Sequence, residues 1–569
     1  MLRRASSWSL LLLVLLAGCS RCGKEKGLTG PSGQPATIER FLPREAQAAI
    51  VVPDLGALGE KLARFQHLKI ASFLAQLQNF QTADAYVSAV MRQVGVDLRS
   101  RQAMEKAGID PGKGAGAAFL AQNQAFSVLG VKDAKALEDT FANLARNRLG
   151  APERKEEKAG GGTLVTFSRK GAPAPQLGLL FIGDFVLVAP GTMVERLPAI
   201  ASQPSEKSLA EEPVLAASLA RLPKERDFHI FLPGGTDLVR PGTVQGVTLT
   251  GVIEEGAVTV RADAPWPDTQ EALAPLVPKD GPDLLGYLPS DSFLVARYRG
   301  DPSTLGGVWP YLVGPYVTRA VQQSNFDLKG EVLDNLQSGV AMGVALAPTA
   351  QFGSGIPELD IRRTSPFRYV QLMVVAEAKD AAKADATLAK VPDISSHFGA
   401  EVKPEDIGGK RVYLTSYKAG EGAHFADVGG KLVLAAPRAR LEAALTGLAG
   451  KPGPVPLAPE LQGVMKDQVL SVVLDLRKLA DSVRNLPSEA WGVGGFAIKA
   501  TAVRWMEATD DLHAVTFSLS QKDKALQAEL SLKLTFAQAQ PSSQPRTPAP
   551  APSPAPAPNQ AQPQPTEAK

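Results

Sequence analysis

The chain has 569 residues, of which 44% are hydrophobic and 21% charged, and its formal net charge is +3. At about 150 residues per domain this length exceeds one hydrophobic core, and the balanced composition excludes a wholly disordered chain and a multi-span membrane protein. The surplus positive charge lies in Arg3, Arg4 and the segment Arg21–Lys26. Because phosphate binding needs a concentrated basic field, we expect no nucleic-acid partner.

Residues 1–18 have the three parts of an export signal. Arg3 and Arg4 precede the apolar run Leu10–Leu16, which small residues follow, and the segment is too short to span a bilayer. The ending Leu16-Ala17-Gly18-Cys19 resembles the lipobox of bacterial prolipoproteins. This resemblance implies cleavage between Gly18 and Cys19 and a diacylglyceryl group on the Cys19 sulfur, with acylation of the new amino group in many bacteria. Two or three acyl chains anchor a protein stably; the alternative is a secretory signal cut elsewhere.

The residues after Cys19 bear on location. In the prolipoprotein pattern an aspartate after the lipidated cysteine retains the protein at the inner membrane, and here that position is Ser20. The resemblance therefore implies an outer-membrane protein that faces the periplasm or the cell surface. Cys22 follows Arg21, which the lipobox does not accept, so we expect either an inert free thiol or an intermolecular disulfide. Residues 19–38, rich in Gly, Pro and polar residues, predict a flexible tether.

The body of the chain repeats short segments at an offset of 246 or 247 residues. The matched segments are Phe41-Leu42-Pro43 with Tyr287-Leu288-Pro289, Lys132-Asp133-Ala134 with Lys379-Asp380-Ala381, Gly162–Val165 with Gly409–Val412, and Gly183–Pro190 with Gly430–Pro437, after which Glu195 matches Glu442. A nearly constant offset across separated segments indicates duplication. We expect two tandem α+β domains, residues 39–265 and 284–536, separated by a proline-rich linker over 266–283.

Hydrophobic periodicity predicts the same elements in both halves. In the first half these are strands Ala125–Val131, Thr163–Ser168 and Phe228–Leu232, a hairpin Leu177–Ala189, and helices Ala134–Arg148 and Met193–Ala201. In the second half they are strands Val370–Ala376, Arg411–Ser416 and Val469–Leu476, a hairpin Ala423–Ala436, and helices Ala381–Lys390 and Ala439–Leu448. The order is that of a split-βαβ, ferredoxin-like unit, a mostly antiparallel sheet with helices on one face.

Each half also opens with a helix-rich insert and ends in a hairpin. The inserts are Leu55–Val94 and Thr304–Leu336, and the hairpins are Val247–Ala262 and Val503–Lys533. In the first insert apolar residues at helical spacing form a broad stripe: Leu62, Phe65, Leu68, Phe73, Leu74, Leu77 and Phe80. The stripe either packs on its own sheet or helps to form a groove for a lipid or another hydrophobic partner.

The last part of the chain, residues 537–569, consists mainly of Pro, Ala, Gln and Ser. Such a composition predicts a disordered tail biased to polyproline II. The whole layout, an exported chain whose halves both open on Leu-Pro, resembles a family of bacterial envelope proteins of unknown function. That resemblance implies no activity.

Chemistry-bearing motifs are scarce. The five histidines, His67, His229, His397, His424 and His513, include no pair at helical metal-binding spacing, and the two cysteines lie near the membrane anchor, so we expect no metal site. Gly108–Gly116 lacks the spacing of a phosphate loop, and we interpret it as a turn that leads into a strand near Ala117. The local groups His424 with Asp427 and His513 with Asp510 and Asp511 give no catalytic motif; alternation places the first pair on opposite faces.

We therefore expect no catalytic, cofactor-binding or metal-binding residues, and Cys19 and Gly18 as the processing site. The predicted function is that of a non-enzymatic, lipid-anchored binding or scaffolding element of the cell envelope, whose partners are the membrane and an envelope protein or hydrophobic ligand. One alternative is a carrier of a lipid or other hydrophobic ligand. A more distant one is an envelope hydrolase whose site is assembled from separated residues.

Overall fold

A computed structural model describes residues 37–536 apart from 122–123, 237–238, 240–243, 267–273, 308–325, 349, 351–364, 397–398, 418–419 and 493–494. The predicted signal, Gly18, Cys19, Cys22, most of the tether and the tail lie outside the described residues, as does His397. Within the described part the fold is mixed α and β, with one large antiparallel sheet of 21 strands.

Ten strands belong to the first half. They are β1 (Ala48–Val52), β2 (Ala115–Phe119), β3 (Ala125–Gly130), β4 (Glu153–Ala159), β5 (Gly162–Ser168), β6 (Leu177–Ile182), β7 (Phe185–Pro190), β8 (Phe228–Pro233), β9 (Gly246–Ile253) and β10 (Ala257–Pro265). The helices are α2 (Leu55–Ala63), α3 (Lys69–Leu77), α4 (Ala83–Val94), α5 (Arg101–Lys106), α6 (Ala134–Leu144), α7 (Leu197–Ala201) and α8 (Pro213–Arg221).

Eleven strands belong to the second half. They are β11 (Leu294–Tyr298), β12 (Val340–Leu346), β13 (Val370–Glu377), β14 (Ala400–Ile407), β15 (Lys410–Tyr417), β16 (Gly420–Glu421), β17 (His424–Val428), β18 (Lys431–Ala436), β19 (Leu470–Asp475), β20 (Leu512–Lys522) and β21 (Ala525–Leu534). The helices are α10 (Ala381–Leu388), α11 (Val391–Ser396), α12 (Arg438–Leu448), α13 (Pro459–Gln462), α14 (Leu476–Arg484) and α15 (Gly495–Ala508).

The strands of the two halves pair in the same order. From the outer edge inward, the first half runs β4-β5-β6-β7-β3-β2-β1-β8-β9-β10. The second half runs β14-β15-β17-β18-β13-β12-β11-β19-β20-β21. Both series end on the last strand of the half, and these two strands pair with each other.

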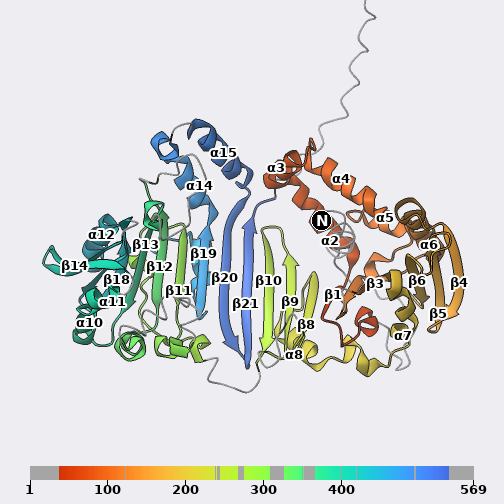
Figure 1. Cartoon of the computed structure of the whole chain (residues 1–569), viewed down its shortest axis with the longest axis horizontal. Coiled ribbons are helices and arrows are strands. Elements are labelled where there is room, and N and C mark those ends of the chain that lie inside the picture. Colours follow the sequence, from red (N-terminus) through yellow and green to blue (C-terminus); the bar gives the residue numbers. More distant parts are fainter. Residues whose placement is uncertain are drawn as a thin grey trace, which may run out of the picture. The chain divides into compact units, whose positions relative to one another are not determined.

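The junction between the halves is the antiparallel pair β10–β21, which continues the sheet across the middle (Figure 1). Arg261 pairs with Glu529, and its Nε donates to the Glu529 carboxylate at 2.7 Å. Thr259 and Ser531 pair in the same ladder, and their hydroxyl oxygens are 3.0 Å apart. The halves therefore share one sheet, which the prediction of two domains joined only by a linker did not include.

The outermost strands carry charge along their exposed side chains. In β4 the sequence is Glu-Arg-Lys-Glu-Glu-Lys-Ala, and six of its seven residues are exposed. In β14 the exposed stretch includes Lys403, Pro404, Glu405 and Asp406. Charged side chains and proline on an edge strand oppose pairing with a further strand. Both ends of the sheet are thus protected against extension.

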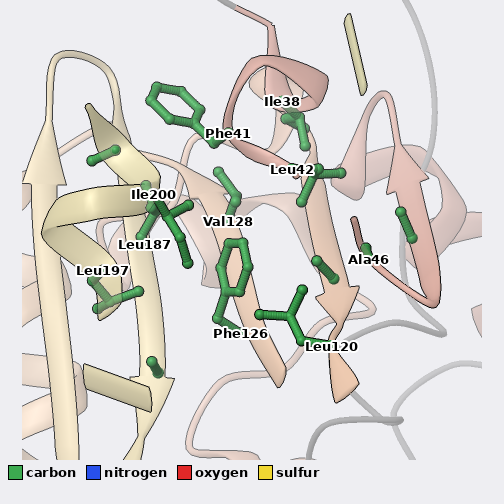
Figure 2. Close-up of a cluster of buried hydrophobic side chains, with 14 of the residues drawn as sticks. Ile38, Phe41, Leu42, Ala46, Leu120, Phe126, Val128, Leu187, Leu197 and Ile200 are labelled. Atoms are coloured by element: carbon green, nitrogen blue, oxygen red, sulfur yellow. The ribbon is translucent and has the colours of Figure 1, made fainter. Parts of the chain in front are cut away.

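Helices and turns cover both faces of the first-half sheet, whereas the sequence predicted helices on one face. Figure 2 shows Phe126 and Val128 of β3 between Leu42 and the side chains of Leu187, Leu197 and Ile200. On the opposite face a second core packs β3 against α2, α5 and α6 through Leu129, Leu55, Met104 and Leu137. The burial of β3 explains the difference: every residue of this strand is buried, and a strand buried on both faces needs two covering layers.

The pairing also differs from the predicted split-βαβ order. That order places the strand that begins at Phe228 (β8) beside the strand that begins at Ala125 (β3). In the structure β1 and β2 lie between them. Both intervening strands are only five residues long, and β2 consists of Ala and Gly before Phe119. The small residues of β2 have weak strand propensity, and neither strand was included in the predicted order.

One predicted hairpin begins too early. Residues Val503–Lys533 were expected to form two strands, but Val503 lies in α15, and the hairpin is β20–β21. Its turn is formed by Asp523 and Lys524, both at positive φ, and not by Asp510-Asp511. Alanine-rich sequence between Phe496 and Ala508 favours a helix, which the strand prediction overlooked. No helix among the described residues combines the length and apolar character needed to cross a bilayer.

Candidate interaction surface

Helices from both halves meet beyond one end of the central strands. The first half supplies α3 and α4 from its insert, and the second supplies α14 and α15, which connect β19 to β20. Figure 1 shows these helices at the same end of β20 and β21, and α3 contacts α15 directly. A surface at this end is therefore built from segments more than 400 residues apart in the chain.

Large apolar side chains are exposed on these helices. The exposed fractions are 47% for Leu74 and 56% for Leu77 on α3, 39% for Tyr86 on α4, and 90% for Phe496 and 40% for Trp505 on α15. We call these five residues the helical end patch. Among the described residues only three other large hydrophobic side chains are comparably exposed, namely Val277, Tyr417 and Leu530. Five of the eight exposed large hydrophobic side chains in the described part thus lie on these helices, which makes this end of the sheet the leading candidate for an interaction surface.

Aromatic contacts hold the helices of the patch together. The rings of Phe73 and Trp505 join α3 to α15 with centroids 4.5 Å apart, and those of Phe80 and Tyr86 lie 5.2 Å apart. Both pairs have the tilted, edge-on geometry that aromatic rings prefer. Trp505 and Tyr86 thus each have one side packed and another exposed.

A polar cluster fastens α3 to the start of β20. The backbone N–H of Lys69 donates to Asp511 Oδ2 at 2.6 Å, and Lys69 Nζ lies 3.1 Å from Asp510 Oδ2. Arg484 at the end of α14 donates to the same Asp510 carboxylate. Burial alone would raise the pKa of Asp510, but the hydrogen bonds from Arg484 and Lys69 outweigh it and lower the pKa. The carboxylate thus stays charged and joins α3, α14 and β20.

The predicted apolar stripe of the first insert divides into a packed and an exposed part. Leu68 is buried, and Leu62, Phe65, Phe73 and Phe80 are half-buried; Phe65 also contacts the ring of Phe536 at 5.1 Å. Leu74 and Leu77 remain exposed. Packing on the protein's own structure therefore accounts for most of the stripe but not for Leu74 and Leu77. The corresponding insert of the second half lies largely outside the described residues.

Sequence reasoning missed Phe496 and Trp505. Both lie in the segment that we assigned in part to a hairpin, so their helical setting was not considered. The run Phe-Ala-Ile-Lys-Ala-Thr-Ala-Val-Arg-Trp could have indicated a helix through its alanines. Its apolar residues occur on more than one side, and a helix that is apolar on several sides must cover them or expose them.

His229 on β8 is buried without a hydrogen-bond partner for either ring nitrogen. Its Nε2 lies 3.8 Å from Glu39 Oε1, which is too long for a hydrogen bond. Burial lowers the pKa of His229 to about 4, although the nearby Glu39 carboxylate acts in the opposite direction and Arg226 adds to the lowering. The ring is therefore a neutral part of the core at pH 7, with no second titratable group bonded to it.

The members of the two local His/carboxylate groups, from which no catalytic motif was expected, bond to other partners. His424 has Glu421 as its partner at 2.7 Å, and its Nδ1 accepts from the Thr415 backbone N–H at 3.0 Å. Asp427 instead accepts from the backbone N–H of Gly430 at 2.7 Å. These contacts agree with the prediction that His424 and Asp427 lie on opposite faces of the strand.

His513 bonds to residues other than Asp510 and Asp511. Its Nε2 lies 2.6 Å from Arg477 Nη2 and 3.0 Å from the Thr535 hydroxyl, whereas Asp510 and Asp511 bind Lys69. Burial and the adjacent Arg477 lower the pKa of His513.

The glycine-rich segment after Gly108 forms a turn, as predicted. Asp110 caps a short 3₁₀ turn, Pro111–Lys113, and β2 follows from Ala115. Lys113 Nζ pairs with Asp184 Oδ2 at 3.1 Å. The lysine is therefore engaged with carboxylates, since Asp110 is also near it at 3.5 Å.

Two surface cavities of about 450 and 510 Å³ lie on the first half. The first is lined mainly by charged residues of α6 and β4, including Lys135, Glu138 and Arg154, and the second by the β4–β5 turn. Neither includes a residue of the helical end patch. In the described part of the chain no three His, Cys, Asp or Glu side chains are placed to hold a metal ion.

Comparisons with known proteins give only distant structural likeness. No protein-family model matches the chain, and no curated protein matches it. Crystal form III of TP0453 is similar at 11% identity over 46% of this chain and 84% of that one, with a TM-score of 0.24. Crystal forms IV and I of TP0453 each cover 42% of this chain, and 84% and 81% of theirs, at 10% and 9% identity and a TM-score of 0.23. Similarity this low does not establish a shared fold.

Proposed function

We propose that the chain is a non-enzymatic, lipid-anchored protein of the cell envelope that acts as a binding or scaffolding element. The observation that carries the binding role is the helical end patch, where five large apolar side chains are exposed on helices contributed by both halves. A soluble surface gains nothing from a fully exposed phenylalanine such as Phe496, whereas a bound partner would remove it from water.

The anchoring part of the proposal rests on the lipobox-like sequence Leu16-Ala17-Gly18-Cys19. Replacement of Cys19 by Ala should move the protein from the membrane fraction to the soluble fraction of lysed cells, because the acyl chains are lost. Cys22→Ala is the matched control and should leave the protein in the membrane fraction. Continued membrane association of Cys19→Ala at high salt would refute the anchor.

We also propose that the two halves arose by duplication. Matched segments occupy corresponding places: Leu42 and Leu288 each follow a 3₁₀ turn and are buried. Asp133 and Asp380 each cap the helix that follows the central strand of their half. The hairpins β4–β5 and β14–β15 both turn on two glycines at positive φ. Leu42 and Leu288 are 246 residues apart and Asp133 and Asp380 are 247 apart, as in the sequence repeat, whereas the turn glycines (Gly160-Gly161 and Gly408-Gly409) are 248 apart.

A carrier of a hydrophobic ligand is the second candidate, and the exposed Leu74 and Leu77 of the predicted stripe favour it. The two surface cavities, however, are bordered by charged side chains or by a turn, unlike apolar ligand pockets. Mass spectrometry of delipidated protein from native membranes distinguishes the candidates. A stoichiometric lipid retained across preparations would favour the carrier over the scaffold.

A further inference from the structure

Helix α3 receives its N-terminal cap from the other half of the chain. The residue before it, Leu68, makes no side-chain hydrogen bond to the helix. Asp511 Oδ2 instead accepts from the Lys69 backbone N–H at 2.6 Å. By contrast, α2, α4, α5, α6 and α8 are each capped by the side chain of the residue that precedes them. Because the first N–H groups of a helix find no partner within it, α3 depends on the second half for a bond that those helices make locally.

The C-terminal end of α3 is closed by its own residues. Asn79 lies in the left-handed region with φ of 63°, and its N–H bonds to the Gln76 carbonyl at 3.0 Å. The Phe80 N–H bonds to the Ala75 carbonyl at 2.9 Å. These two bonds form the closure with which helices commonly end. The dependence on the second half for backbone bonding therefore lies at the N-terminal end.

Little of α3 is buried. Among its nine residues, all of which the structure describes, only Ala75 is buried, and none belongs to a hydrophobic cluster of the described part. Its main neighbours are α4, the 3₁₀ turn Arg64–His67 and α15. A helix of this length is marginal by itself, and segments with few buried apolar contacts open more readily than a core. Helix α3 should therefore be less stable than the sheet.

Helix α4, in the same insert, is held by its own half. Its residues Met91 and Val94 pack against the core that lies between α2, α5, α6 and β3. Arg99 donates to Asp84 Oδ1 at 2.7 Å and to Ser88 Oγ at 3.0 Å. Because these contacts lie within the first half, α4 does not need the second half to stay in place.

Two further contacts join α3 to the second half. Lys69 Nζ lies 3.1 Å from Asp510 Oδ2, and the rings of Phe73 and Trp505 have centroids 4.5 Å apart. With the Asp511 cap, three contacts to the second half thus involve residues 69–73, the first five of α3. Movement of α3 away from α15 and from the turn at 509–511 removes all three together.

We propose that α3 is a strap between the halves whose helical state depends on docking. Docked on α15 and on the turn at 509–511, α3 is helical. When this contact opens, the cap and the aromatic pair are lost together and the helix unravels, while the sheet stays intact. The strand pair β10–β21 joins the halves independently of the strap, so the strap can open without separating them. Ordering and disordering of one short segment is an established form of conformational switch.

Opening of the strap changes the helical end patch. Leu74 and Leu77 lie on α3, so unravelling removes their fixed positions. It also exposes the Phe73 ring and the side of Trp505 that this ring covers. The strap thus determines how much apolar surface this end of the molecule presents. The link to binding rests on the proposed function, whereas the opening itself does not.

Native-state hydrogen exchange, followed by mass spectrometry, tests the strap in the full mature chain with Cys19→Ser, which needs no membrane. We expect the amides of α3 to exchange through an opening that depends weakly on urea, and those of β20 and β21 through global unfolding. Asp511→Ala should raise exchange in the last turn of α3 about fivefold, because it removes a helix cap. Trp505→Ala should raise it about tenfold, because it removes the aromatic pair and its apolar contact.

Glu507→Ala is the matched control, because Glu507 is an exposed acidic residue of α15 that is not bonded to Lys69. It should leave exchange of α3 unchanged, and unchanged exchange of β20 and β21 shows that each variant is folded. Exchange of α3 in the parent chain only at the rate of β20 and β21 would overturn the strap.

Unchanged exchange of α3 in Asp511→Ala or in Trp505→Ala would also overturn it. So would an equal rise in α3 and α4, because α4 is held by its own half. No binding partner is present in the experiment. Failure of the strap therefore leaves the proposed binding role standing, and failure of that role leaves the strap standing.

Discussion

The two halves place different residues at corresponding positions of the same sheet. Asp263 of β10 pairs with Thr248 of β9, and Ser531 of β21 pairs with Thr516 of β20. The two partners are equally far apart in sequence in both hairpins, so Asp263 and Ser531 hold corresponding positions. Asp263 is fully buried and receives two hydrogen bonds from Arg221 of α8, at 2.6 and 2.9 Å. Ser531 contacts only the Thr259 hydroxyl through its side chain in the described part. One strand order therefore accommodates an ion pair within the first half at one position and, at the corresponding position of the second half, a hydroxyl pair that crosses the junction to Thr259.

The largest difference between the halves should come from this pair of positions. Asp263→Ala leaves the partly buried Arg221 guanidinium without its carboxylate and should lower the free energy of unfolding by about 3–5 kcal/mol. Ser531→Ala removes one hydroxyl hydrogen bond and should cost about 1 kcal/mol. Urea unfolding followed by circular dichroism measures both. Equal losses would show that the buried ion pair is energetically no different from the hydroxyl pair.

The buried histidines should give the halves different responses to acid. Burial lowers the pKa of His229 to about 4, below the unfolded value of about 6.5. The neutral ring is thus favoured in the fold, so its contribution is present above about pH 6.5 and is lost as pH falls toward 4. The loss amounts to about 3 kcal/mol.

His229→Leu should remove this part of the pH dependence of unfolding. The surrounding charged groups, Glu39 and Arg226, are unchanged in the variant, so the difference between the two pH profiles isolates the histidine. His424→Leu is the comparison in the second half, where the ring has Glu421 and the Thr415 N–H as partners. It should destabilise at pH 7, because the Thr415 N–H loses its acceptor. A parallel pH profile for wild type and His229→Leu would contradict the assignment.

The smallest expected difference concerns two helix caps. Asp133 accepts from the Ala136 backbone N–H at 3.0 Å, and Asp380 accepts from the Lys383 N–H at 3.1 Å. Asp133→Ala and Asp380→Ala should each cost about 1 kcal/mol, because each removes one cap of the same geometry. Hydrogen exchange of the first-turn amides of α6 and α10 reports the local effect. A severalfold difference between the two variants in the change of exchange rate would show that the two caps do not contribute equally to their helices.

The sequence predicted the elements whose signals are local. Hydrophobic periodicity indicated α6 and α10, and apolar runs around Gly183 and Gly430 indicated the hairpins that the structure contains. The charged edge strands β4 and β14 were missed because neither shows apolar alternation. The pairing β10–β21 joins residues 268 apart at Arg261 and Glu529, and no local pattern encodes such a partner.

The candidate surface was predictable only in part. The stripe from Leu62 to Phe80 pointed to the first insert as one alternative, but periodicity could not tell which of its residues remain exposed. Exposure of Leu74 and Leu77 depends on where α15 packs, and α15 lies in the other half of the chain. Trp505 was lost to a hairpin assignment that began at Val503, and Phe496 was assigned to no element, although alanine-rich helical sequence surrounds both.

The ion pair at the junction bears on why the two halves belong to one chain. Within its own hairpin, Arg261 pairs with Thr250, and Glu529 pairs with Ser518 at the same sequence separation. Arg261 and Glu529 therefore hold equivalent positions in the two halves. They also pair with each other across the junction. In a dimer of identical chains, a residue on a twofold axis meets its own copy, and two arginines or two glutamates would repel. Joining the halves removes that symmetry constraint. A fused chain can place opposite charges on the axis, and pairing of two first halves through β10 is then disfavoured by the arginine that stabilises the correct partner.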